Sequence, residues 1–171
     1  ALLSLQPNII TNDRLKRPNF PGDYKTPEQR IPNLSELDGK DWETCMTMGD
    51  QWSFKPNDRY KSTHQLIHLL VDIVAKGGNF LLNVGPDADG RFPGPAVQRL
   101  REIGDWMKVN GDAIYGTRPI APYKEGKIAL TRKNGTTYAI YMLDEGEQLP
   151  REIAIRSVRP KQGAKVRMLG G

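Results

Sequence analysis

The stretch AKGGNFLLNVGP, residues 75–86, decides how this chain folds. Its apolar centre, residues 80–84, is too short for a helix and lies between a Gly-Gly pair and a Gly-Pro pair. Short apolar runs bounded by helix-breaking residues are typical of strands in parallel sheets, which are covered on both faces. We therefore predict a fully buried strand over residues 80–84.

The residues before this strand predict an amphipathic helix. Aliphatic side chains dominate residues 66–74. Polar residues recur at every fourth position along the same segment, at His64, His68, Asp72 and Lys76. Ser62 or Thr63 is a suitable N-cap, and the glycine pair at 77–78 is a suitable C-terminal stop.

A second helix is predicted after the strand, beginning at Gly94-Pro95 and ending at Asn110-Gly111. Proline is favoured at the first helical position, because the amide hydrogen that it lacks would have no partner there. The expected buried face of this helix consists of Val97, Leu100, Ile103 and Met107. A helix, a buried strand and a helix in this order predict an α/β protein.

The N-terminal part of the chain alternates strand candidates with long loops. Residues 2–6 have the pattern of a helix end, and residues 7–11 that of a short strand. Loops rich in proline or glycine are predicted at 15–40 and 49–61, with a second strand between them at 41–48. A loop as long as the first is usually functional or disordered.

The pattern changes after residue 117. Asn134-Gly135 separates two runs of β-forming residues, and Asn-Gly in this position is the strongest short-range signal of a hairpin. These runs and two further strand candidates cover residues 127–131, 136–142, 152–158 and 164–169. We predict two domains: an α/β unit over residues 1–117 and a small antiparallel β module over residues 118–171.

Composition excludes several classes of partner. The 171 residues include 25 basic and 20 acidic side chains, giving a net charge of +5. The excess does not form a basic stripe with stacking aromatic residues, so we do not expect nucleic-acid binding. No apolar run approaches the roughly 20 residues of a membrane span, so we do not expect a membrane partner.

The single cysteine and the N-terminus bear on the compartment. Cys45 is the only cysteine, which excludes a disulfide within this sequence and fits a reducing environment. Residues 1–5 lack the basic start and the cleavage site of a signal peptide, so none is expected in this chain. A cytoplasmic or a periplasmic location in a bacterium stays open.

Two carboxyl groups are candidates for proton transfer. Glu28 lies in the long loop after the first predicted strand, and Glu43 lies on or near the second. In α/β barrels, groups at the carboxyl ends of strands converge on one face. A carboxylic acid placed there beside aromatic residues can protonate a leaving group. Composition leaves the alternative open that both are solvated surface glutamates.

Arg14 and Trp52 are candidates for binding a sugar. Arg14 follows the first predicted strand and could donate hydrogen bonds to sugar hydroxyls, or form a surface ion pair with Asp13 or Glu28. Trp52 lies in a loop, where its ring could stack on the apolar face of a sugar or pack in the core. We expect Trp42 and Phe54 to be core residues.

No metal site and no cofactor are predicted. His64 and His68 are spaced as in the zinc motif H-E-x-x-H, but Gln65 occupies the place of its glutamate. A helix surface is therefore expected. The run DADG at residues 87–90 has the start of a calcium-binding loop without its later ligands, so we expect a turn there.

Five segments form a combined pattern. They are SLQPNIITNDR (4–14), DYKTPEQRIP (23–32), DWETCMTM (41–48), KGGNFLLNVGP (76–86) and WMKVNGDAIYGT (106–117). In this order they resemble the family 29 glycoside hydrolases, the α-L-fucosidases. Residues 118–171 are similar, less distinctively, to the start of the C-terminal β-sandwich of that family.

The resemblance implies the C-terminal half of a (β/α) TIM-type barrel that releases terminal α-L-fucose with retention of configuration. Retaining enzymes use two carboxyl groups about 5 Å apart, a nucleophile and an acid/base. Glu28 in Thr-Pro-Glu matches the position of the acid/base, and Glu43 is the alternative for this role. Arg14 matches a fucose-binding arginine, and Trp52 matches an aromatic residue on the methyl side of the sugar.

The family's nucleophile, an aspartate, and its fucose-binding histidines precede all five segments. A closed barrel has eight strands and typically about 250 residues, and a half barrel leaves sheet edges unpaired and an apolar face uncovered. We therefore expect a truncated enzyme that acts on a fucosylated glycan or fucoside as a homo-oligomer or with a complementary half-barrel chain. The alternatives are one half of a split enzyme and a catalytically silent carbohydrate-binding or scaffold fragment.

Overall fold

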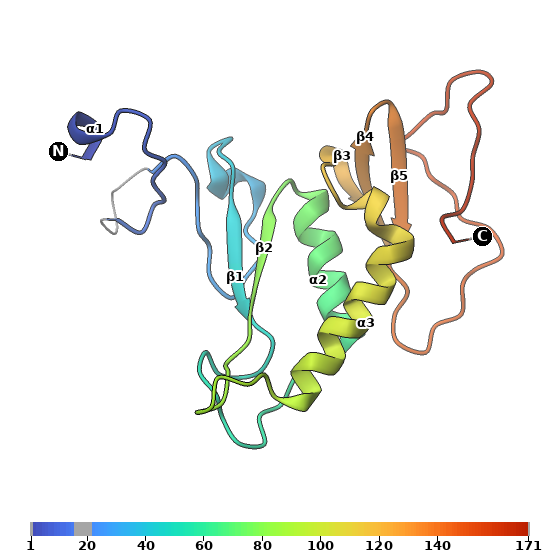
Figure 1. The fold of residues 1–171 in the computed structure, drawn as a ribbon. Helices are drawn as coiled ribbons and strands as arrows, with labels where there is room; N and C mark the ends of the chain where they lie inside the picture. Colours follow the sequence, from blue (N-terminus) through green and yellow to red (C-terminus); the bar gives the residue numbers. More distant parts are fainter. Residues whose placement is uncertain (1, 16–21, 171) are drawn as a thin grey trace.

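Figure 1 shows the computed structural model of the chain, which describes residues 2–15 and 22–170. The elements are α1 (Leu2–Leu5), a 3-10 turn (Leu34–Leu37), β1 (Glu43–Thr47), α2 (Thr63–Ala75), β2 (Asn79–Asn83), α3 (Gly94–Asn110), a second 3-10 turn (Gly111–Ala113), β3 (Arg118–Glu125), β4 (Ile128–Lys133) and β5 (Thr136–Tyr141). Part of the predicted loop 15–40, residues 16–21, lies outside the described residues. No helix among the described residues is long and apolar enough to cross a bilayer.

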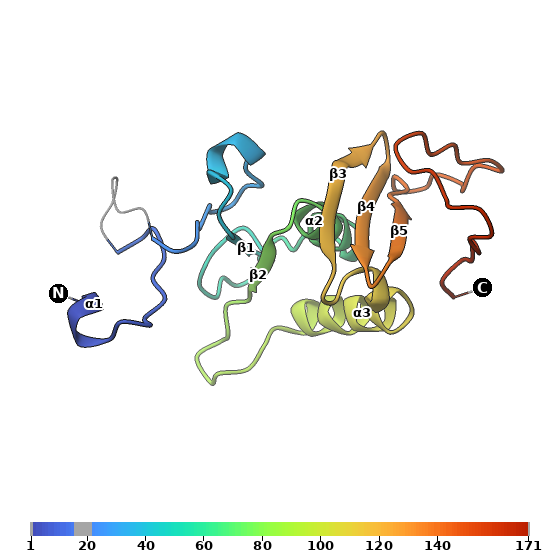
Figure 2. The same cartoon turned by 90° about the horizontal axis from the view of Figure 1, so that it is seen from above.

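The elements form two sheets with two long helices beside them. Figures 1 and 2 show β1 and β2 on one side of α2, and the antiparallel strands β3, β4 and β5 on the other. The C-terminal tail lies beyond β5, at the end of the molecule opposite to the N-terminus. The predicted order of helix, strand and helix is confirmed, as α2, β2 and α3.

Short parallel segments lie next to one another on the N-terminal side. β1 pairs in parallel with β2, from Glu43 opposite Asn79 to Thr47 opposite Asn83. On the other side of β1, isolated parallel bridges join Lys25 to Trp42, Glu28 to Cys45 and, further out, Asn12 to Tyr24. The segment before β1 therefore extends the parallel arrangement, and it places Lys25 and Glu28 next to β1.

Local sequence accounts for both ends of α2. The Ser62 hydroxyl accepts a hydrogen bond from the amide of Gln65, and the Gln65 side chain accepts one from the amide of Ser62. This capping box satisfies two amides that the helix leaves without partners. At the other end, Gly77 has a φ of 79°, and the amides of Gly77 and Gly78 donate to the carbonyls of Val74 and Ile73. The predicted cap and stop are confirmed.

Helix α2 is the centre of the core, because three hydrophobic clusters contain its residues. The cluster toward the antiparallel sheet consists of Val71, Ala75, Ile114, Ala129 and Met142. The cluster toward β1 consists of Ile73, Leu37, Trp42 and Met46. The cluster toward α3 consists of Leu66, Met48 and Ala96. Each large side chain that is fully buried stabilises the fold by about 1.5–3 kcal/mol relative to exposure. The expectation that Trp42 is a core residue is confirmed.

The predicted hairpin is present. Asn134 and Gly135 have φ values of 48° and 79°, so both central residues of the turn are left-handed, as a type I′ turn requires. β4 is the middle strand, and its residues 128–131 are buried. The hydroxyl of Thr131 donates to the carbonyl of Ala113 at 2.8 Å, which ties the sheet to the turn after α3.

The strand over residues 80–84 is not fully buried, contrary to the prediction. Leu81 has 52% of its surface exposed. The reason is that β2 pairs only with β1, and no further described layer covers the outer face of this pair. Leu100 was predicted on the buried face of α3, but it is 39% exposed, so this prediction is also wrong. Phe54, expected in the core, is 43% exposed in its loop.

Other predicted strands are absent among the described residues. Residues 7–11 form no strand, and the segments 152–158 and 164–169 are irregular and largely exposed. Alternation alone does not make a strand, because its backbone groups need a neighbouring strand as partner. In the tail, the Glu125 carboxylate instead accepts hydrogen bonds from the amides of Arg156 and Ser157 and from the Ser157 hydroxyl.

Candidate active site

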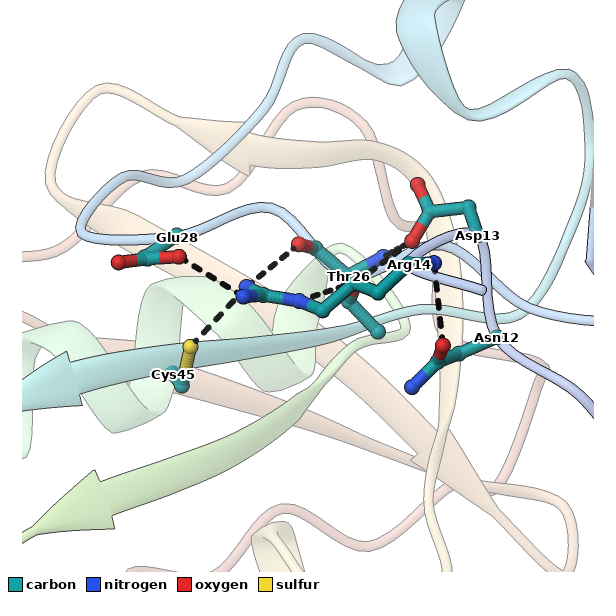
Figure 3. Close-up of polar contacts among 6 residues, drawn as sticks. All are labelled: Asn12, Asp13, Arg14, Thr26, Glu28 and Cys45. Atoms are coloured by element: carbon teal, nitrogen blue, oxygen red, sulfur yellow. Dashed lines mark hydrogen bonds and ion pairs between the residues drawn. The ribbon is translucent and has the colours of Figure 1, made fainter. Parts of the chain in front are cut away.

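Arg14 is the centre of a compact polar group, drawn in Figure 3. Its Nε donates to Thr26 Oγ1 at 2.8 Å, and one terminal nitrogen donates to the Thr26 carbonyl at 3.1 Å. The other terminal nitrogen lies 2.8 Å from Glu28 Oε2 in a salt bridge. A further contact of 3.4 Å joins Arg14 to the Cys45 sulfur. The group therefore connects three segments of the chain, two of them before β1 and one on it.

The backbone around Arg14 is fixed by its neighbours. Asn12 Oδ1 accepts the Arg14 amide hydrogen at 3.0 Å, which forms a local turn just after the parallel bridge from Asn12 to Tyr24. Asp13 points the other way, and its Oδ1 accepts from the amide and the hydroxyl of Thr26 at 3.0 and 2.5 Å. Of the two ion-pair partners considered for Arg14, the structure pairs it with Glu28.

Electrostatics keep Arg14 charged. Burial alone would lower the pKa of its guanidinium, but the hydrogen bond to Glu28 and the negative charges of Glu28 and Asp13 outweigh this effect and raise the pKa. A guanidinium has no acceptor atom and loses its proton only in strong base. Arg14 is therefore a permanent hydrogen-bond donor in this group.

Contacts of the next residue, Gln29, hold the backbone at Glu28 in place. The Gln29 amide donates to the Cys45 carbonyl at 2.9 Å. The Gln29 side chain donates to Thr47 Oγ1 at 3.0 Å and accepts from the Thr47 amide at 3.3 Å. The backbone at Gln29 is left-handed, with a φ of 55°. The Glu28 carboxyl thus combines an anchored backbone with a side chain that is 39% exposed.

Trp52 borders an apolar hollow of about 390 Å³ beside β1 and β2. The hollow is lined by Cys45, Trp52, Leu81, Asn83, Phe92 and Leu100, among others. Asn83 Nδ2 donates to the Trp52 carbonyl at 2.8 Å, which fixes the loop to the end of β2. Cys45 belongs to both the hollow and the polar group of Arg14, so the two are adjacent.

Glu43 lies apart from the Arg14–Glu28 contact. It is the first residue of β1, whereas Glu28 bridges to Cys45 two residues further along. Residues two apart on a strand share a face, so Glu43 and Cys45 point to the same side of β1. The structure thus brings Arg14, Glu28 and, through Cys45, Trp52 together, whereas Glu43 only shares with Cys45 one face of β1.

Four side chains of this site were not identified from the sequence. Asp13 was considered only as an ion-pair partner, and Thr26, Gln29 and Cys45 were given no place in the site. The available signal was positional, since all four adjoin or alternate with a predicted site residue. Their contacts depend on the register between segments, which residue types alone do not specify.

The family comparison covers all of these residues. A family model described as Alpha-L-fucosidase matches residues 2–112. This chain belongs to the alpha-L-fucosidase family. Arg14, Glu28, Glu43 and Trp52 all lie within the matched residues, and the resemblance noted in the sequence is confirmed.

Individual proteins that are similar to this chain are also alpha-L-fucosidases. An alpha-L-fucosidase of Branchiostoma floridae is 36% identical over 143 residues, which are 78% of this chain and 32% of that protein. The tissue alpha-L-fucosidase of Mus musculus is 31% identical over 172 residues, covering 95% of this chain and 37% of that protein. The chain therefore spans about a third of the length of the curated fucosidases that it matches.

Solved fucosidase structures share the fold. Alpha-L-fucosidase isoenzyme 1 from Paenibacillus thiaminolyticus superposes with a TM-score of 0.73 at 38% identity, covering 85% of this chain and 37% of that chain. The Thermotoga maritima alpha-fucosidase in complex with a mechanism-based inhibitor gives 0.69 at 35% identity, covering 82% of this chain and 33% of that chain. These identities support a common ancestry as well as a common fold.

Proposed function

We propose that this chain carries the acid/base part of an α-L-fucosidase that releases terminal α-L-fucose from a fucosylated glycan or fucoside. The observation that supports this best is the Arg14–Glu28 contact of 2.8 Å beside the hollow that Trp52 borders. The carboxyl group can transfer the proton, the guanidinium can donate hydrogen bonds to sugar hydroxyls, and the aromatic ring can cover an apolar face of the sugar. All three lie within the residues that match the fucosidase family.

In this proposal Glu28 is the acid/base of a retaining mechanism. Its protonated carboxyl gives a proton to the glycosidic oxygen as the bond from that oxygen to the anomeric carbon breaks. A nucleophilic carboxylate about 5 Å away forms the covalent fucosyl intermediate. Glu28 then takes a proton from the water that attacks the intermediate, which releases fucose and restores both carboxyl groups. In this proposal the nucleophile is supplied by another chain or by a residue repurposed within an oligomer.

Arg14 and Trp52 bind the sugar in this scheme. The N–H groups of Arg14 that face Glu28 and Cys45 would donate to fucose oxygens. The Trp52 ring, which is 42% exposed, would cover the apolar side of the sugar that bears its methyl group. Glu43, on the same face of β1 as Cys45, is the alternative acid/base.

A half-barrel architecture belongs to the same proposal. It is supported by the parallel order of the segments through Asn12, Tyr24, β1 and β2, and by the exposed apolar residues beside β2. We propose residues 1–117 as the C-terminal half of a (β/α) barrel and residues 118–171 as part of a β-sandwich. A second copy or a complementary half-barrel chain would cover the open face and supply the nucleophile.

Hydrolysis of 4-nitrophenyl α-L-fucoside by the purified chain tests this proposal. Glu28→Gln should abolish activity, because an amide can neither give nor take the proton. Glu43→Gln tests the alternative assignment, and Glu152→Gln in the exposed tail is the matched control. The oligomeric state of each sample should be measured at the same concentration.

The outcomes separate the functional alternatives. Activity lost only in Glu28→Gln supports the assignment, whereas loss only in Glu43→Gln transfers the role to Glu43. Fucose binding without hydrolysis by any variant would favour a carbohydrate-binding fragment or one half of a split enzyme. Full activity in both glutamine variants would contradict the proposed mechanism.

A further inference from the structure

Thr26, which is buried, and Asp13, which is partly buried, support Arg14 from behind. Thr26 is 8% exposed, and it contacts Arg14 through both its hydroxyl and its carbonyl oxygen. Asp13 Oδ1 in turn accepts from the hydroxyl and the amide of Thr26. Figure 3 shows Thr26 between the Asp13 carboxylate and the guanidinium. The ordinary alternative is that this pair only joins two loops.

The direction of these hydrogen bonds is determined by their chemistry. A carboxylate only accepts, so the single hydroxyl proton of Thr26 points to Asp13. The lone pairs of that oxygen are then free to accept from Arg14 Nε. With Nε and one terminal nitrogen bound to Thr26, rotation of the guanidinium about its long side chain is restrained at two atoms.

We propose that Asp13 and Thr26 are positioning residues. They hold the Arg14 guanidinium so that the N–H groups not bonded to Thr26 face Glu28 and the sugar. The part of this inference that concerns the sugar rests on the proposed function. A flexible arginine loses side-chain entropy when it binds a ligand, and a pre-positioned one loses less. Losing the support should therefore weaken sugar binding without removing any group that touches the sugar.

The test compares Thr26→Val with Thr26→Ser in the full chain. Valine keeps the shape of threonine but has no hydroxyl, and serine restores the hydroxyl. The first measurement is solvent exchange of the Arg14 Nε–H by ¹H–¹⁵N NMR, with the signal assigned from its absence in Arg14→Lys. The second is the affinity for L-fucose by titration calorimetry. Asp13→Asn is a second variant, in case Thr26→Val does not fold.

We expect faster Nε–H exchange and about tenfold weaker fucose binding in Thr26→Val, since one hydrogen bond to a charged group is lost. Thr26→Ser should restore both. Asp13→Asn should give an intermediate increase in exchange, because a neutral amide orients the hydroxyl less strongly.

Two results would overturn the inference: unchanged Nε–H exchange in Thr26→Val, or faster exchange with unchanged fucose affinity. A purely structural role would lower the stability of both Thr26 variants without separating valine from serine in exchange. A chain that binds no fucose at all would refute the proposed function. The exchange rate of Arg14 would still decide whether Thr26 holds the guanidinium.

Discussion

Gln29 is an unusual residue at the level of single side chains, because it combines a left-handed backbone with a side chain bonded to Thr47. A residue other than glycine in this conformation costs of order 1 kcal/mol and persists only where its surroundings hold it. Such residues are frequent at functional sites, and this one directly follows Glu28. The amide of Gln29 and its two bonds to Thr47 are what hold it.

Substitutions at Gln29 should separate the two effects. Gln29→Ala loses the bonds to Thr47 and keeps the unfavourable backbone, so we expect a loss of about 1–2 kcal/mol in the free energy of unfolding. Gln29→Gly loses the same bonds but tolerates a φ of 55°, and should be about 1 kcal/mol more stable than the alanine variant. Urea unfolding measures both, and an alanine variant as stable as the glycine variant would contradict the prediction.

His68 gives the fold a dependence on pH. Burial lowers its pKa from the ordinary value of 6.5, and the nearby charges of His64 and Lys124 lower it further, against the opposing effects of Asp144 and the Leu143 carbonyl. Below pH 6.5 the unfolded chain therefore binds more protons at this position than the folded chain. The free energy of unfolding should fall as pH decreases through this range.

The variant His68→Gln should reduce this dependence. We expect its stability to change less than that of the unaltered chain between pH 7.5 and 5.5, as measured by urea unfolding. The carboxylates of Glu36, Glu102 and Asp144 have lowered pKa values, so their contribution is lost only at more acidic pH. An equal pH dependence in both proteins would assign the effect to other groups.

At the level of elements, the junction of α2, β1 and β2 depends on Gly78. A methyl group on Gly78 would overlap the ring carbons of Trp42, whose Nε1–H also donates to the Lys76 carbonyl at 3.3 Å. We expect Gly78→Ala to destabilise the chain by about 1–3 kcal/mol, because the buried ring has to move. The tryptophan fluorescence of the chain, to which Trp42 contributes, and its urea unfolding should both change.

Gly104 provides the matched control for this prediction. It lies inside α3, and an added methyl group would meet no atom within 4 Å. Gly104→Ala should stabilise the chain by about 0.5–1 kcal/mol, because alanine favours the helix and restricts the unfolded chain. Two alanine substitutions with opposite effects would show that the contact with Trp42, and not the loss of glycine as such, is decisive.

The elements that could be predicted from the sequence are those with local signals. α2 has its cap and its glycine stop within a few residues, and the β4–β5 hairpin has Asn-Gly in its turn. β3 was missed because Pro119 and Pro122 argue against a strand, although an edge strand tolerates proline. The strands expected at 152–158 and 164–169 failed because a strand needs a partner that its own sequence does not reveal.

The same distinction applies to the candidate site. The resemblance pointed to Arg14, Glu28 and Trp52, and the structure brings these into one region. The contacts of Arg14 with Thr26 and Cys45 join residues 12 and 31 positions apart. Such contacts depend on how parallel segments align, and neither composition nor spacing specifies this alignment.

For the whole molecule, the exposed side of β2 leads us to expect self-association. Leu81, Phe92 and Leu100 expose large apolar surfaces on the hollow that Trp52 also borders. Apolar patches of this kind favour association in water. We therefore expect the chain to form oligomers whose proportion rises with concentration, as sedimentation velocity would detect.

Leu81→Lys should shift this equilibrium toward the monomer by about tenfold or more, since a charge at a buried contact is costly. Its effect on monomer stability should be small, because the side chain is already 52% exposed. Val166→Lys, at a tail position that is 90% exposed, is the control and should leave association unchanged. A stable monomer at all concentrations would rule out self-association through this face.

The attachment of the tail through Glu125 has a consequence for proteolysis. Trypsin needs several residues of extended, accessible backbone, and the tail offers this around the exposed residues Arg151, Lys161, Lys165 and Arg167. Cuts after Lys161 and beyond would release short peptides at once. A cut after Arg151 would leave a fragment whose hydrogen bonds to the Glu125 carboxylate help to retain it, and Glu125→Gln should speed its loss. Digestion would thus define a compact product ending near residue 150, a natural boundary for a shorter chain.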